Sequence, residues 1–125
     1  MGRRSRARAK SGVAPLAATA SEYTDAERNV LVLRGSLTVG ARREYAETLA
    51  GADARAAATQ GDIEQRAFEL LFERLAVCWT ISGAKIERPK ELLMRLRAST
   101  AAERAWVRGA LREHCSEWFP DVLVP

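Results

Sequence analysis

The pattern of apolar and polar positions along the chain predicts two helices in its first half. Thr38 is placed as the N-cap of a helix over Val39–Ala50, and Gly51 can end this helix in the left-handed conformation. Asp62 is expected to be the N-cap of a second, more apolar helix. The apolar residues of this second helix recur on two adjacent stripes, which indicates contact on more than one side. We therefore expect it to be the central element of the core.

Two more helices are predicted in the C-terminal third. Pro89 suits the first position of a short helix, because its missing N–H is not needed there. The spacing of Thr100 and Glu103 predicts a capping box for a last helix from about Ala101 to Trp118. Phe119-Pro120 is expected to stop this helix.

Extended structure is predicted at two places. The apolar run within Asn29–Arg34 is short and β-branched, which favours a buried strand. Val77–Ile81 is read as a second short extended piece that ends at Ser82-Gly83, and the polar segment Tyr23–Arg28 as a short helical turn. Periodicity leaves Ala52–Gln60 open between a helical extension and a loop. The pattern as a whole predicts a mainly α fold, a small bundle of about four helices with a short β element near residues 29–34.

Charge divides the chain into an arm and a body. The chain has 125 residues and a net charge of +4, but residues 11–125 carry fifteen basic against sixteen acidic side chains. All of the excess lies in a short N-terminal stretch that contains Arg3, Arg4, Arg6, Arg8 and Lys10. We expect residues 1–21 to be a flexible basic arm and residues 22–125 a single helical domain. A nucleic-acid reader usually carries a basic face on its folded domain, and the body of this chain is nearly neutral. If nucleic acid is bound, the five basic residues of the arm are therefore the expected contacts.

Candidate catalytic and metal-binding residues are few. Cys78 and Cys115 lack the spacing of a structural zinc site, and His114 is the only histidine. A pair formed in space by Cys78 and His114 stays open as an alternative, whereas a lone histidine near a helix end is more often structural. No nucleotide-binding loop or paired carboxylate motif is present. We therefore expect a protein that is not an enzyme and that needs no metal and no cofactor.

Candidate partner-binding residues lie on the last predicted helix. Aromatic residues are enriched at binding hot spots, and Trp118 and Phe119 are expected to be the most exposed because chain ends lie at the surface, with Trp106 as a third candidate. Three arginines recur four residues apart on one face of this helix and could grip an acidic partner: Arg104, Arg108 and Arg112. A solvated, salt-bridged face is the favoured alternative for this row, because acidic residues lie on the same helix.

Three segments resemble the tail assembly chaperones of long-tailed bacteriophages, especially the small proteins of actinobacterial phages. They are Leu33–Thr38 followed by a charged helix, Leu75–Gly83 with its Trp-Thr-Ile-Ser-Gly ending, and the Glu103–Trp106 stretch of the last helix. The resemblance covers roughly residues 30–119. The basic arm is not typical of that family.

The resemblance implies a mainly helical, non-enzymatic protein of the host cell cytoplasm. Such a protein binds the long apolar tape measure protein and keeps it soluble while tail tube subunits assemble. Two alternatives come from other classes: a virion structural or neck protein, and a small nucleic-acid-binding protein acting through the arm. A homo-oligomer is compatible with each of these roles. The chain has no run of about 18–20 apolar residues, so we expect no membrane span.

Overall fold

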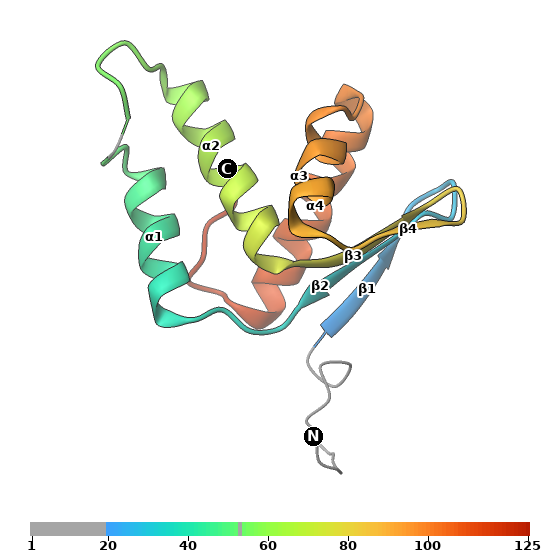
Figure 1. The fold of residues 1–125 in the computed structure, drawn as a ribbon. Helices are drawn as coiled ribbons and strands as arrows, with labels where there is room; N and C mark the ends of the chain where they lie inside the picture. Colours follow the sequence, from blue (N-terminus) through green and yellow to red (C-terminus); the bar gives the residue numbers. More distant parts are fainter. Residues whose placement is uncertain (1–19, 53) are drawn as a thin grey trace.

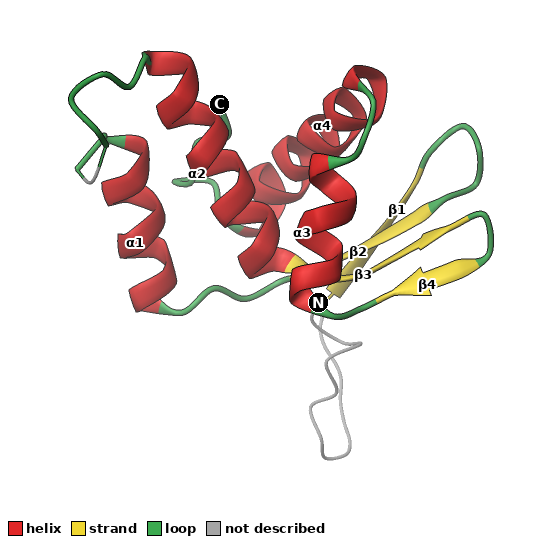
Figure 2. Ribbon diagram, turned by 45° about the horizontal axis from the view of Figure 1, so that its top comes forward, coloured by secondary structure: helices red, strands yellow, loops and turns green. Residues whose placement is uncertain are grey.

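The chain folds as a four-stranded antiparallel sheet with helices against one of its faces (Figure 1). The computed structural model describes residues 20–52 and 54–125. The elements of this part are, in chain order, β1 (Ala20–Thr24), β2 (Val30–Arg34), α1 (Val39–Leu49), α2 (Gln60–Leu75), β3 (Ala76–Ile81), β4 (Ala84–Ile86), α3 (Pro89–Arg97) and α4 (Ala101–Trp118). The strands lie in the order β1-β2-β3-β4. Figure 2 shows α3 and α4 over the sheet, with α1 and α2 beside it as an antiparallel pair.

The expected helical bundle is therefore wrong, and the fold is mixed α/β. The four expected helices are present, but they pack on a sheet rather than only on one another. The sheet was underestimated because its edge strands give weak sequence signals. β1 is polar and begins at Ala20, inside the stretch expected to be an arm, and β4 has only three residues.

A hairpin replaces the helical turn expected at Tyr23–Arg28. The carboxylate of Asp25 accepts hydrogen bonds from the backbone N–H groups of Glu27 and Asn29, at 2.8 and 2.9 Å. Arg28 adopts a left-handed conformation with φ of 68°. An Asp side chain that bonds the backbone two residues on is a turn signal, and here it competes successfully with helix formation.

The extended piece expected at Val77–Ile81 is the third strand, and it continues through a tight turn into β4. Ser82 and Gly83, the two central residues of the turn, have φ of 50° and 81°. Two consecutive positive φ values are those of a type I′ turn, which matches the twist of a two-stranded hairpin. The N–H of Ser82 donates to the side-chain oxygen of Asn29 at 3.0 Å, which ties this turn to the other hairpin.

The capping signals place most helix ends correctly. Thr38 caps α1, Pro89 opens α3, and Thr100 and Glu103 form the expected capping box at α4. The expected N-cap of the second helix is wrong, because Thr59 is the N-cap of α2 and Asp62 is the acidic partner inside its capping box. The helix begins at Gln60, so Asp62 lies three residues after the cap, where its carboxylate accepts from the Thr59 N–H at 2.9 Å.

The core lies between the sheet and the helices. Its largest fully buried side chains include Trp79 of β3 and Phe68 and Phe72 of α2. The rings of Phe72 and Trp79 meet edge to face, with their centroids 5.9 Å apart. The expectation that the second helix is the central core element is confirmed, since five of its side chains are buried. No helix in residues 20–52 and 54–125 is long and apolar enough to cross a membrane.

Candidate partner-binding site

The second face of the sheet is not covered by any helix of the described residues (Figures 1 and 2). Successive side chains of a strand point to opposite faces, and directly paired residues share a face. The residues on the core side of the two central strands include Leu31, Leu33 and Trp79. The side chains that do not pack against the core are Val30 and Val32 of β2 and Val77, Cys78 and Thr80 of β3. We call these five residues the open face.

A bulge widens the apolar part of the open face. Val32 pairs with Cys78 and Leu33 pairs with Ala76, so Val77 is the extra residue of β3. Ala76 returns to the core, whereas Val77 does not join it. The bulge therefore adds one valine to the face that no helix covers.

Charged residues of both edge strands surround the open face. Glu22 of β1 pairs with Val32, and Lys85 of β4 pairs with Thr80, so both lie on the same side of the sheet as the valines. Burial raises the pKa of the Cys78 thiol, and the charges of Lys85, Glu87 and Glu22 modify this shift. An apolar centre with a mixed-charge rim is the usual composition of a protein interface.

The sequence of the two central strands, β2 and β3, is typical of strands that are buried on both faces. An antiparallel strand with one wet face normally alternates apolar and polar residues, whereas strands buried on both faces read as continuous apolar runs. Val30-Leu31-Val32-Leu33 and Ala76-Val77-Cys78-Trp79 are such continuous runs. The open face is thus composed like an interior surface, with Cys78 only 9% exposed and the three valines half-buried, although no helix of the described residues covers it.

His114 does not form the pair with Cys78 that the sequence left open. Its Nδ1 lies 2.9 Å from the Tyr23 hydroxyl and its Nε2 lies 2.8 Å from the backbone oxygen of Arg34, so both ring nitrogens are used. The imidazole is fully buried in the core, whereas Cys78 lies on the other side of the sheet. Burial lowers the pKa of His114, which keeps the ring neutral near pH 7.

The thiols are not activated for nucleophilic chemistry. Burial raises the pKa of Cys115 to about 11, and the pKa of Cys78 is also raised. A reactive cysteine requires the opposite shift, because the thiolate is the nucleophile. Within the described part of the chain no group of three or more His, Cys, Asp or Glu side chains is arranged to hold a metal ion.

The aromatic residues expected at a binding surface are mostly engaged inside the domain. Phe119 is only 2% exposed, so the expectation that it is exposed is wrong. Arg42 lies over its ring, 5.1 Å from the centroid. Trp118 is half-buried and donates through Nε1 to the Ser21 hydroxyl at 3.1 Å. Trp106 is half-buried as well and lines a groove beside β1.

The three arginines of the last helix also bind within the domain. Arg104 donates to the backbone oxygen of Ser99, and Arg112 donates to that of Val124 at 3.4 Å. The guanidinium of Arg108 lies 4.5 Å from the centroid of the Phe68 ring. The row is therefore not assembled into one cationic site. The arm residues Arg3, Arg4, Arg6, Arg8 and Lys10 lie outside the described residues.

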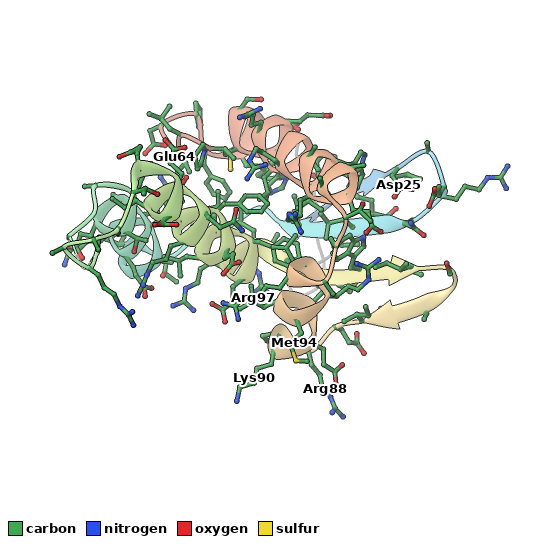
Figure 3. All side chains as sticks on the ribbon, turned by 90° about the horizontal axis from the view of Figure 1, so that it is seen from above. Asp25, Glu64, Arg88, Lys90, Met94 and Arg97 are labelled. Carbon is green, nitrogen blue, oxygen red and sulfur yellow. The ribbon has the colours of Figure 1, made fainter. Side chains whose placement is uncertain are left out.

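The most exposed large apolar side chains do not form a patch. Val39, Met94 and Leu123 are 74%, 67% and 72% exposed, and they belong to α1, α3 and the C-terminal segment. Figure 3 shows Met94 on the outer side of α3 beside Lys90 and Arg88. Single exposed apolar residues are normal on a protein surface, so the open face is the stronger candidate.

The open face was missed as a site because the apolar runs were assigned to the core. The run at residues 30–33 predicted a buried strand, and its two faces were not distinguished. The available signal was the lack of alternation in two strands that later proved to be antiparallel neighbours.

Comparison of the chain with protein-family models, with curated proteins and with solved structures finds no match.

Proposed function

We propose that this protein is a non-enzymatic binding module that holds an apolar segment of a partner protein on the open face of its sheet. The observation that carries the proposal is the apolar surface formed by the half-buried Val30, Val32 and Val77 around Cys78, which no helix of the described residues covers. The engaged histidine and the raised thiol pKa values give no support to a catalytic alternative.

The specific form of the proposal is a tail assembly chaperone that binds the tape measure protein of a long-tailed bacteriophage in the host cytoplasm. This form rests on the resemblance of residues 30–119. The open face supports it physically, because an amphipathic helix can lay its apolar side on such a surface while the charged rim fixes its orientation. Glu22 and Lys85, on opposite edges, offer one charge of each sign to such a helix.

A charge placed on the open face tests the binding surface. Val32→Glu should abolish co-purification of the tape measure protein when the two are produced together, because a carboxylate would be desolvated in the interface. Val39→Glu is the matched control, since Val39 is 74% exposed and lies on α1. Equal loss in both variants, or no loss in Val32→Glu, would show that the open face is not the binding surface.

The location of the protein in phage-producing cells tests the role. A chaperone should be recovered with the tape measure protein from cell lysates and should be missing from purified particles. Its presence in purified virions in stoichiometric amounts would refute this role and support the virion structural alternative.

A further inference from the structure

A groove lies between the outer edge of β1 and one face of α4. β1 is the terminal strand of the sheet, and within the described residues no strand pairs with its outer edge. The groove has a volume of about 540 Å³ and is lined by Glu22, Tyr23, Thr24, Trp106, Gly109, Ala110 and Glu113. The backbone N–H and C=O groups on the outer side of an edge strand can bind an extended segment as an additional strand.

Two hydrogen bonds fix the direction of α4 along β1. The Tyr23 hydroxyl lies 2.9 Å from Nδ1 of His114, and the Ser21 hydroxyl accepts from Nε1 of Trp118 at 3.1 Å. The helix therefore runs antiparallel to the strand, and Glu113 lies at the level of Tyr23. Burial raises the pKa of Tyr23, and the charge of Glu113 raises it further, which shows that this carboxylate is close to the strand.

The wall of the groove on α4 has no side chain at Gly109. This residue lies about one turn before Glu113, so it is on the same face of the helix and nearer to the Thr24 end of β1. Glycine destabilises the middle of a helix relative to alanine. A Cβ atom built on Gly109 would meet no other atom within 4 Å, so the packing of the described residues does not require glycine there. The glycine does leave room for another backbone to approach α4 closely.

The charge of the groove indicates the kind of segment that fits it. Glu22 and Glu113 line the groove, and none of its lining residues is basic. Glu22 is the middle residue of β1, so a second copy of β1 paired antiparallel along its full length would place the two Glu22 side chains directly opposite each other. The charge therefore favours a basic segment of another protein over a second copy of this chain.

We propose that this groove binds an extended basic segment of a partner protein as a fifth strand of the sheet. The side chains of a strand alternate between its two faces, and neighbours across a pair share a face. The partner residue beside Tyr23 faces α4 and is basic, because it lies next to Glu113. The next partner residue on that face lies over Gly109 and is small. The partner residue beside Glu22 faces the opposite way, toward the open-face side of the sheet, and is also basic.

The partner segment therefore has two adjacent basic residues and a small residue two positions from the one that faces α4. This inference does not rest on the occupant of the open face, because it uses the outer edge of β1 and the surface of α4. The two sites have separate tests, since Val32→Glu blocks the open face and should not weaken binding of a basic segment in the groove.

Selection of a displayed library of random nine-residue peptides on the full-length protein tests this site. Enriched peptides should contain the basic pair and the small residue at the stated spacing. Glu113→Lys should weaken binding of a selected peptide at least about tenfold in isothermal titration calorimetry, because it places like charges in contact. Glu64→Lys is the matched control, since Glu64 is an exposed helical carboxylate of α2 that does not line the groove.

The glycine gives a second pair of variants. Gly109→Val should abolish binding of the selected peptide by filling the space over α4. Gly40→Val is its control, because Gly40 is also helical, has similarly open surroundings and lies in α1. If Gly109→Val unfolds α4, the comparison of Glu113→Lys with Glu64→Lys still decides the outcome.

Hydrogen–deuterium exchange shows whether the selected peptide adds to the sheet. In the complex, the alternate amides of β1 that point away from β2 should exchange at least about tenfold more slowly than in the free protein. Unchanged exchange in β1 would overturn the proposal. Failure to enrich any peptide, enrichment of peptides without the basic pair, or equal effects of Glu113→Lys and Glu64→Lys would overturn it as well.

Discussion

His114 joins the last helix to the first two strands through both of its ring nitrogens. The Arg34 carbonyl can only accept, so Nε2 carries the proton, and Nδ1 therefore accepts from the Tyr23 hydroxyl. The ring also packs against Trp118 and Phe119, with centroid distances of 6.0 Å in both cases. A polar side chain in this position is stabilising only while it is neutral, because protonation would charge a buried group whose Nδ1 faces its donor.

The stability of the fold should therefore fall as His114 becomes charged. Burial lowers the pKa of the folded state below the ordinary value of 6.5. As the pH falls through 6.5, the unfolded chain takes up a proton that the folded chain resists, so the free energy of unfolding decreases until the folded pKa is reached. Urea unfolding between pH 7.5 and 5.5 should show this decrease in the wild type and a shallower one in His114→Gln.

Tyr23→Phe is the control for this pH effect. It leaves Nδ1 without its donor, which should cost about 1–3 kcal/mol, but the histidine still titrates. The pH dependence should remain in this variant. If His114→Gln and the wild type show the same slope, another group is responsible.

Adjacent residues of β2 should differ sharply in their importance for stability. Leu33 is fully buried in the core, whereas Val32 lies on the open face. Leu33→Ala should lower the free energy of unfolding by about 2–5 kcal/mol, and Val32→Ala by less than about 1.5 kcal/mol. Chemical denaturation measures both. Similar losses would mean that something covers Val32 in solution.

At the level of elements, local signals predicted the helices and missed half of the sheet. Helix ends are set by residues three or four positions apart, such as Thr100 and Glu103, so a single sequence reveals them. Strand pairing joins distant residues, such as Leu31 and Trp79, and no local pattern encodes it. The candidate surface was missed for the same reason, because the two faces of a strand differ only once the helices pack against one of them.

The hairpin of β3 and β4 depends on its turn. Gly83 has φ of 81°, a conformation that costs a non-glycine residue roughly 1 kcal/mol or more. Gly83→Ala should lower the free energy of unfolding by about that amount. Gly40→Ala should be neutral or slightly stabilising, because Gly40 is helical and has room for a Cβ. Thermal or urea unfolding of both variants gives the comparison, and an unaffected Gly83→Ala would mean that the turn is not constrained in solution.

At the level of the whole molecule, the charge of the chain is separated between a basic N-terminal stretch and a nearly neutral body. Residues 1–10 carry five basic side chains and no acidic one, and residues 11–125 have a net charge of −1. Several arginines of the folded part form ion pairs, such as Arg74 with Glu44 and Arg97 with Glu69. Any affinity for nucleic acid should therefore come from residues 1–10 alone.

This separation predicts how the protein responds to salt. Binding of a short DNA duplex, followed by fluorescence anisotropy between 50 and 200 mM salt, should show a slope of log K against log salt no steeper than about −4.5, because at most five phosphates can be neutralised. Deletion of residues 2–10 should abolish the binding. Binding that survives the deletion would place the nucleic-acid contact on the folded body.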